Sequence, residues 1–137
     1  MIKPSKNFEV KPRKTKALAE LLDLPATIAD MCDIKLSYTQ FGKSLVHILN
    51  GDEQHKDAIF CEGGRIHGEI QAMEKGHGPT SPYYPRLSTQ SSEGPEHTKA
   101  LMCRMGNLKY TMRLYEKDEL YDLDKDPLEL NNVIDEK

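Results

Sequence analysis

The side chains best suited to chemistry lie on one irregular stretch in the middle of the chain. Arg65, His67 and Glu69 alternate in the sequence, so an extended backbone would point all three the same way. His97 and Lys99 alternate in the same manner. Neutral imidazoles and cations on an irregular loop can hold an anionic or polyol ligand. Ordinary surface polarity explains the same residues equally well, so the pattern leaves both interpretations open.

A thiol also stands four residues before an arginine, at Cys61 and Arg65. This spacing could place a nucleophile next to an anion clamp. However, the sequence puts no base beside Cys61, and this cysteine ends an apolar run. We therefore interpret Cys61 as structural.

Asp122, Asp124 and Asp126 alternate like the start of a calcium-binding EF-hand loop. The sixth loop position requires glycine and holds Pro127, and the twelfth requires glutamate and holds Val133. The calcium-loop interpretation fails, and a capped turn is the better prediction. The sequence contains no HExxH, P-loop, GxSxG or spaced Cys/His metal motif.

Composition narrows the class of protein. The chain has 137 residues, 30% of them charged, and a net charge of -3, which argues against a dedicated nucleic-acid binder. A basic run near the N-terminus is interpreted as a solvated arm. No window is apolar enough to span a membrane, and residues 1–16 lack the apolar core of a signal peptide. Either the protein is cytosolic or the chain begins partway into a longer one.

The cysteines fit neither a disulfide framework nor a zinc finger. Cys32, Cys61 and Cys103 are widely spaced and odd in number. We expect three reduced thiols, with Cys32 and Cys103 packed as small hydrophobic side chains.

The first third of the chain predicts a lead-in followed by two helices. Residues 1–16 are polar and indicate an extended segment with little core of its own. A helix is expected over about 25–32 with Asp23 near its N-cap, and Pro25, Ile28, Ala29 and Cys32 form its apolar face. A longer helix from Ala17, kinked near Pro25, is the alternative.

A second, short helix and a strand are expected next. Ser44 is predicted to cap the helix, and Asn50 and Gly51 to end it. Residues 57–61 then predict a buried strand.

The remaining chain divides into a long loop and a small sheet. Residues 62–99 hold six of the nine glycines and show no periodicity, although Tyr83 and Tyr84 favour an ordered loop over disorder. Residues 100–123 predict a three-stranded antiparallel meander with a hairpin turn at 105–107. In its second strand Tyr110 and Met112 share one face, as on a half-solvated sheet.

Five segments together resemble the sulfatase family, in the family's own order. The helix with Asp23-Leu24-Pro25-Ala26-Thr27 is similar to the family's D-l-x-P-T helix. The other four matching segments are 41–51, 56–62, 102–110 and 119–132, the last resembling "ELYDLenDPxExxNL". The resemblance covers residues 17–133, which form the C-terminal part of such an enzyme.

The resemblance implies a fold of the α+β class. It is the C-terminal part of an α/β alkaline-phosphatase-like sulfatase fold, with a small antiparallel sheet and one or two packing helices. The two regions are then a lead-in over 1–16 and a sulfatase C-terminal region over 17–137. Residues 1–4 resemble the chain just after the family's R-x-P segment, and the expectation from this resemblance is that Met1 is an internal start.

The family's catalytic apparatus is not recognisable in this chain. The family uses a divalent cation (calcium) and a formylglycine made within a C/S-x-P/A-x-R motif. Residues 61–65 copy the ends of that motif, but Gly63 stands where proline or alanine is required. We therefore expect no catalytic residue, metal ligand or cofactor in this chain by itself.

The resulting expectation is the C-terminal part of a sulfuric ester hydrolase that forms one side of the substrate pocket. Arg65, His67, His97 and Lys99 are the predicted contacts to a sulfated sugar or small sulfate ester. The alternatives are a stand-alone binding module without chemistry and a non-functional remnant. Exposed apolar surface, including Leu18, Leu22 and Ile28, would favour self-association of the isolated chain. The compartment stays open, since sulfatases are often exported and carry that signal at their own N-terminus.

Overall fold

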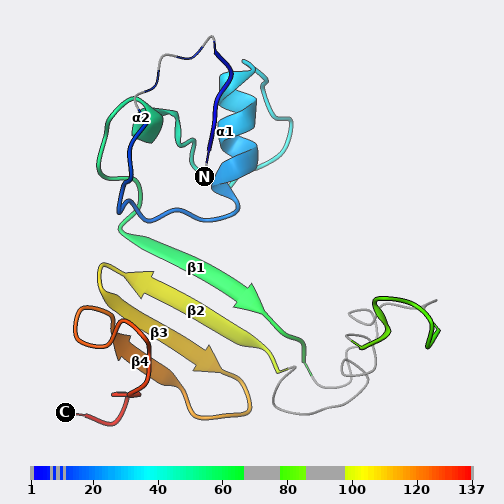
Figure 1. Ribbon diagram of the computed structural model, residues 1–137, viewed down its shortest axis with the longest axis vertical. Helices are drawn as coiled ribbons and strands as arrows, with labels where there is room; N and C mark the ends of the chain where they lie inside the picture. The colour runs from blue at the N-terminus through cyan, green and yellow to red at the C-terminus, as the bar shows by residue number, and fades with distance from the viewer. Residues whose placement is uncertain are drawn as a thin grey trace. The chain divides into compact units, whose positions relative to one another are not determined.

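The computed structural model describes residues 2–6, 8, 10, 12–66, 78–85 and 98–136. Their elements are α1 (Asp23–Met31), α2 (Val46–Leu49), β1 (Ala58–Gly63), β2 (Ala100–Met105), β3 (Leu108–Arg113) and β4 (Glu119–Asp122). The chain divides into two compact units, Met1–Ile59 and Phe60–Lys137. Figure 1 shows the helices α1 and α2 in the first unit and the strands following in chain order.

The helix α1 begins two residues earlier than the sequence predicts. Asp23 is its first residue and Leu22 its N-cap, so Asp23 is not the cap itself. Pro25 still lies in the first turn, where its missing N–H removes no helical hydrogen bond. The helix ends where Asp33 takes a positive φ of 52°, and the Ile34 amide returns to the Ala29 carbonyl at 2.8 Å.

The buried face of α1 differs from the predicted one. Asp23, Thr27 and Ala29 are buried, whereas Ile28 is 61% exposed, and Pro25 and Cys32 are exposed as well. The prediction placed the apolar residues inward, which is wrong for all but Ala29. Polar side chains are buried instead because they bond the backbone of the segment packed against the helix.

The helix α2 is one short turn close to its predicted place. Ser44 precedes the N-cap Leu45, and its hydroxyl accepts a hydrogen bond from the Val46 amide at 3.2 Å. Asn50 is the C-cap, and Gly51 follows with a φ of 126°. Leu45 and Ile48 are buried and, with Ala29, form the apolar core of this unit.

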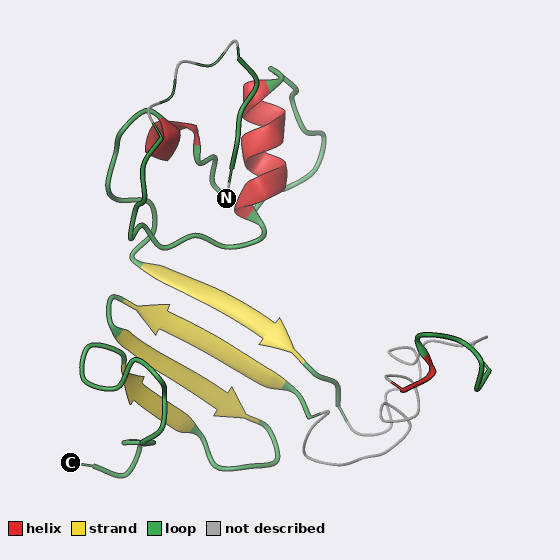
Figure 2. Cartoon of the chain, in the orientation of Figure 1, coloured by secondary structure: helices red, strands yellow, loops and turns green. Residues whose placement is uncertain are grey.

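The second unit is built on a four-stranded sheet with the order β1-β2-β3-β4 (Figure 2). The strands β2, β3 and β4 form the expected antiparallel meander, and β1 adds a fourth strand at its edge. Gly106, with a φ of 54°, makes the hairpin turn between β2 and β3. The α+β class with a small antiparallel sheet and two helices is therefore confirmed.

Two burial predictions for the strands are wrong. The last four residues of β1 are exposed, and Phe60 is 66% exposed, because nothing in the described part of the chain covers this end of the strand. On β3 the apolar residues Tyr110 and Met112 are exposed, whereas Thr111 on the opposite face is buried. On β3, the face that carries Thr111 is therefore more buried than the face that carries Tyr110 and Met112.

The segment after β4 folds back on the sheet and is held there by hydrogen bonds. The Leu123 amide bonds the Asn107 carbonyl at 2.8 Å, and the Val133 amide bonds the Leu120 carbonyl at 2.9 Å. Asp126 accepts the Asn131 amide at 2.8 Å. The aspartates of this segment therefore cap turns, as the sequence predicts.

Candidate functional site

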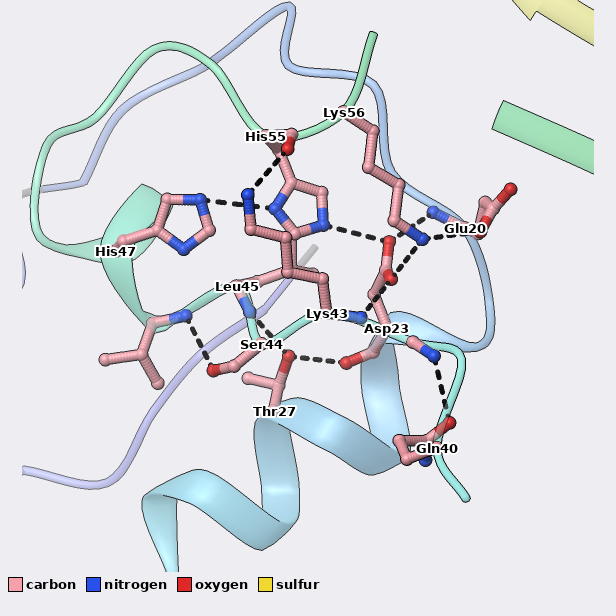
Figure 3. A network of polar contacts seen from close by, with 12 residues as sticks. Glu20, Asp23, Thr27, Gln40, Lys43, Ser44, Leu45, His47, His55 and Lys56 are labelled. Atoms are coloured by element: carbon pink, nitrogen blue, oxygen red, sulfur yellow. Dashed lines mark hydrogen bonds and ion pairs between the residues drawn. The ribbon is translucent and has the colours of Figure 1, made fainter. Parts of the chain in front are cut away.

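A buried polar network surrounds Asp23 in the first unit (Figure 3). The Asp23 side chain is fully buried, and dashed lines converge on it from three chain segments. Its Oδ1 accepts the Lys43 amide at 2.8 Å, and its Oδ2 accepts the Glu20 amide at 2.8 Å. The Lys56 ammonium lies 2.7 Å from Oδ1. One carboxylate therefore joins the start of α1 to two later segments.

Thr27 continues this arrangement one helical turn further on. Its hydroxyl donates to the Asp23 carbonyl at 2.6 Å and accepts the Leu45 amide at 2.9 Å. Residues four apart on a helix share a face, so Asp23 and Thr27 together bind the backbone of the segment that leads into α2.

Gly42 allows this segment to approach α1. A Cβ at Gly42 would lie 1.8 Å from the Leu22 carbonyl oxygen, far inside van der Waals contact. The Gly42 amide also donates to Gln40 Oε1 at 3.0 Å. Only glycine fits here while the Lys43 amide still reaches Asp23.

The charges of the network stabilise one another. Burial acts to raise the pKa of Asp23, but hydrogen bonds from the Lys43 amide and the Lys56 ammonium outweigh it and bring the pKa to about 2. Burial likewise acts to lower the pKa of Lys56, yet its contacts with Asp23 and Glu20 raise it. The Lys56 ammonium lies 2.6 Å from Glu20 Oε2. Asp23 therefore remains ionised at neutral pH.

Two histidines extend the network from Asp23. The buried His55 places Nε2 3.1 Å from Asp23 Oδ2 and Nδ1 3.2 Å from His47 Nε2. The ring centroids of the two histidines are 5.0 Å apart. Lys43 Nζ donates to the His55 carbonyl at 2.9 Å.

The described side chains of this network bond to one another and to the backbone of neighbouring segments. Its carboxylate, hydroxyl and imidazole groups take part in the hydrogen bonds given above. Neither the hydroxyl of Thr27 nor the carboxylate of Asp23 is exposed. The arrangement therefore holds chain segments in position.

Two of the four predicted substrate contacts lie next to each other in the second unit. Arg65 and Thr98 form an isolated parallel bridge, and the Lys99 amide donates to the Arg65 carbonyl at 2.9 Å. The Lys99 ammonium forms an ion pair with Glu62, and Arg65 is only 6% exposed. His67 and His97 lie outside the described residues, so the complete predicted set stays a prediction.

The described residues do not gather into a site for the metal and formylglycine that the resemblance to sulfatases implies. Among the described residues no three His, Cys, Asp or Glu side chains gather in a way that could hold a metal ion. Cys61 lies on the exposed edge strand β1, and all three cysteines are free thiols. Cys32, the residue that follows α1, is exposed rather than packed as predicted. We therefore derive no catalytic step through either group.

The network around Asp23 was missed by analysis of the sequence. Asp23 was interpreted as a helix cap, and His47 and His55 were given no role. The only sequence feature that indicates the network is the spacing of Asp23 and Thr27, which places them on one face of a helix. An ordinary helix cap explains the same spacing equally well. The contact to His55, 32 residues further on, leaves no local pattern.

Comparison with solved structures shows which proteins this chain is similar to. A 2-O GAG sulfatase matches 83% of this chain with 26% identity and a TM-score of 0.54. A candidate sulfatase from Bacteroides thetaiotaomicron VPI-5482 matches 81% with 27% identity and a TM-score of 0.52. The phosphonate monoester hydrolase of Agrobacterium radiobacter matches 83% with 26% identity and a TM-score of 0.54. The resemblance to sulfatases is therefore confirmed by solved structures.

The match spans only a small part of each of those proteins. This chain covers 20%, 19% and 20% of their lengths, respectively. No protein-family model and no curated protein matches the chain. No helix in the described part is long and apolar enough to cross a membrane.

Proposed function

We propose that this chain is the C-terminal part of a sulfuric ester hydrolase and forms one side of its substrate pocket. The observation that carries the proposal is the structural match of more than four-fifths of the chain to about one-fifth of sulfatases and a phosphonate monoester hydrolase. The nucleophile and the metal ligands then belong to the other four-fifths. By itself, the chain is expected to be inactive.

Exposed apolar surface in each unit supports this proposal. On α1 and the segment before it, Leu21 is 83% exposed and Ile28 is 61% exposed. On the sheet, Met105 opposite Leu108 and Leu101 opposite Met112 expose apolar side chains on one face. Soluble monomers seldom leave large apolar patches open, so surfaces of this kind suit a chain that packs against further protein.

Arg65, His67, His97 and Lys99 remain the proposed contacts to a sulfated small molecule or sugar. Arg65 and Lys99 are adjacent through the Lys99 amide and the Arg65 carbonyl. Guanidinium and ammonium groups can bind a sulfate group, and imidazoles can bond the hydroxyls around it. The match to a phosphonate monoester hydrolase makes phosphonate monoesters the second ester class to test.

The DNA upstream of the Met1 codon tests the proposal directly. We expect an open reading frame in register that encodes C/S-x-P/A-x-R, followed by further aspartate, lysine and histidine residues for the metal and the sulfate. A stop codon directly upstream, together with no such motif nearby, would contradict the proposal and leave the binding module or the remnant.

A further inference from the structure

The pair His47 and His55 closes a turn of the first unit. His47 belongs to α2, and His55 follows a turn that includes Gly51 and Asp52. The Gly51 amide bonds the Ile48 carbonyl at 3.2 Å, and the Asp52 amide bonds the His47 carbonyl at 3.1 Å. The contact between His55 Nδ1 and His47 Nε2, at 3.2 Å, joins the two ends of this turn.

The positions of the protons follow from the partners of His55. Asp23 is ionised and can only accept, so His55 Nε2 carries a proton and donates to Asp23 Oδ2 at 3.1 Å. A neutral His55 then has a lone pair on Nδ1, which accepts from His47 Nε2. If His55 is protonated at Nδ1, His47 must instead offer a lone pair at Nε2. The gap between the rings therefore holds one proton and has no room for two.

We propose that His47 and His55 form a proton-operated latch on the turn between α2 and β1. One extra proton on the pair leaves the contact intact, because one ring still accepts. A second proton makes both facing nitrogens donors and both rings cations, so the contact breaks. His55 stays with Asp23, and His47, which is only half-buried, moves toward solvent.

The charges around the pair act in both directions. Asp23, on α1, and Glu20, just before it, favour positive charge. Lys43 bonds the His55 carbonyl at 2.9 Å, and Lys56 pairs with Asp23 at 2.7 Å; both oppose a doubly charged pair. Lys56 pairs with both carboxylates, and the Lys43 ammonium is a second cation beside His55. The two carboxylates and the two ammonium groups balance, so a doubly charged histidine pair is not neutralised by its neighbours.

Opening of the latch would also weaken the attachment of the N-terminal segment, because Arg13 binds this segment to the turn. Its guanidinium bonds the Ile48 carbonyl at 2.8 Å and also contacts the Asp52 carbonyl and the Glu53 carboxylate. These groups lie on the turn that the histidine pair closes. A change in the turn therefore loosens the anchor of the segment before α1.

Hydrogen exchange of the whole chain tests the latch. Between about pH 8 and about pH 5, where imidazoles change charge, protection of the Gly51 and Asp52 amides should fall after correction for intrinsic exchange. The expected fall is about fivefold or more, the factor that one hydrogen bond contributes. Unchanged protection over this interval would overturn the proposal.

The variant His47→Gln separates the latch from other histidines. A glutamine amide nitrogen can donate to His55 Nδ1 and does not titrate, so protection of the turn should become independent of pH. The control His77→Gln removes a different histidine and should keep the dependence of the unsubstituted chain. A His47→Gln chain that still loses protection at low pH would overturn the latch.

A second readout stays decisive if His47→Gln does not fold. Nuclear magnetic resonance of the imidazole nitrogens of the unsubstituted chain shows directly which of the two facing nitrogens, His47 Nε2 and His55 Nδ1, carries a proton. Where the turn amides are protected, one of these nitrogens should carry a proton and the other a lone pair. Loss of protection at the Gly51 and Asp52 amides while one facing nitrogen still lacks a proton would show that the proposal is wrong.

Discussion

At the scale of single residues, Asp23 does more for this chain than its sequence context indicates. It begins α1, binds the amides of Glu20 and Lys43, and pairs with Lys56. A buried charge of this kind is tolerated because its partners are already in place. The same residue anchors the His55 ring.

Asp23→Asn should therefore destabilise the first unit at neutral pH. We expect a loss of at least about 2 kcal/mol in the free energy of unfolding, which corresponds to a pKa lowered from 3.8 to about 2. Urea denaturation followed by circular dichroism measures it. Asp23 contributes this stability above its unfolded pKa, so the advantage over Asp23→Asn should vanish as the pH falls from about 4 to about 2.

Asp30→Asn is the matched control on the same helix. Asp30 is exposed and accepts a hydrogen bond from the Ser44 hydroxyl. Because exposed polar contacts contribute little, its cost should stay below about 1 kcal/mol. If the two variants lost the same free energy of unfolding, the buried contacts of Asp23 would contribute no more stability than the exposed contact of Asp30.

His97→Ala tests the proposed substrate contacts once the upstream part is restored. We expect a higher KM, or a lower kcat/KM, for a sulfate ester, because a contact to the bound ester is lost. Initial-rate kinetics on purified enzyme give both constants. Kinetics identical to those of the unsubstituted enzyme would remove His97 from the proposed site.

At the scale of elements, local patterns predicted which elements form better than which faces they bury. The meander appears where Gly106 and the alternation of Tyr110 and Met112 indicate it, because turns and strand periodicity are local properties. Burial depends on what packs against an element. Ile28 and Phe60 were expected inside and are exposed, since nothing in the described chain covers them.

The candidate site was harder to predict than the fold for the same reason. The bond between Asp23 and His55 joins residues far apart in the sequence, and only the path of the segment between them brings the two together. Arg65 and Lys99 were predicted as ligand contacts from their type. Their adjacency through the bridge at Thr98 could not be inferred from spacing.

Gly42→Ala should disrupt the packing of the segment before α2 on α1. The new methyl group would meet the backbone at Leu22, which cannot move without shifting the helix start, so we expect a loss of about 1 to 3 kcal/mol. Hydrogen exchange of the Lys43 and Leu45 amides reports it locally.

Gly63→Ala is the control for this substitution. A Cβ at Gly63 meets no atom within 4 Å, so alanine should be accepted without loss of protection at Lys43. If Gly42→Ala exchanged as slowly as Gly63→Ala, the close approach at Gly42 would not matter for stability.

At the scale of the whole molecule, the exposed apolar surfaces predict that the isolated chain self-associates. Sedimentation velocity should show species larger than the 15.6 kDa monomer at micromolar concentration. Ile28→Lys places a charge on the exposed face of α1 and should shift the distribution toward monomer. The exposed Asp30→Asn should not, and a monomer with a sharp two-state melt would instead favour a stand-alone binding module.

The proposed enzyme function is tested most directly by hydrolysis of an aryl sulfate, with a phosphonate monoester measured beside it. The chain alone should show no rate above buffer, and the longer product read from the upstream DNA should hydrolyse at least one of the two esters. Hydrolysis by the chain alone, or an inactive longer product that is folded and carries the intact C/S-x-P/A-x-R motif, would contradict the account.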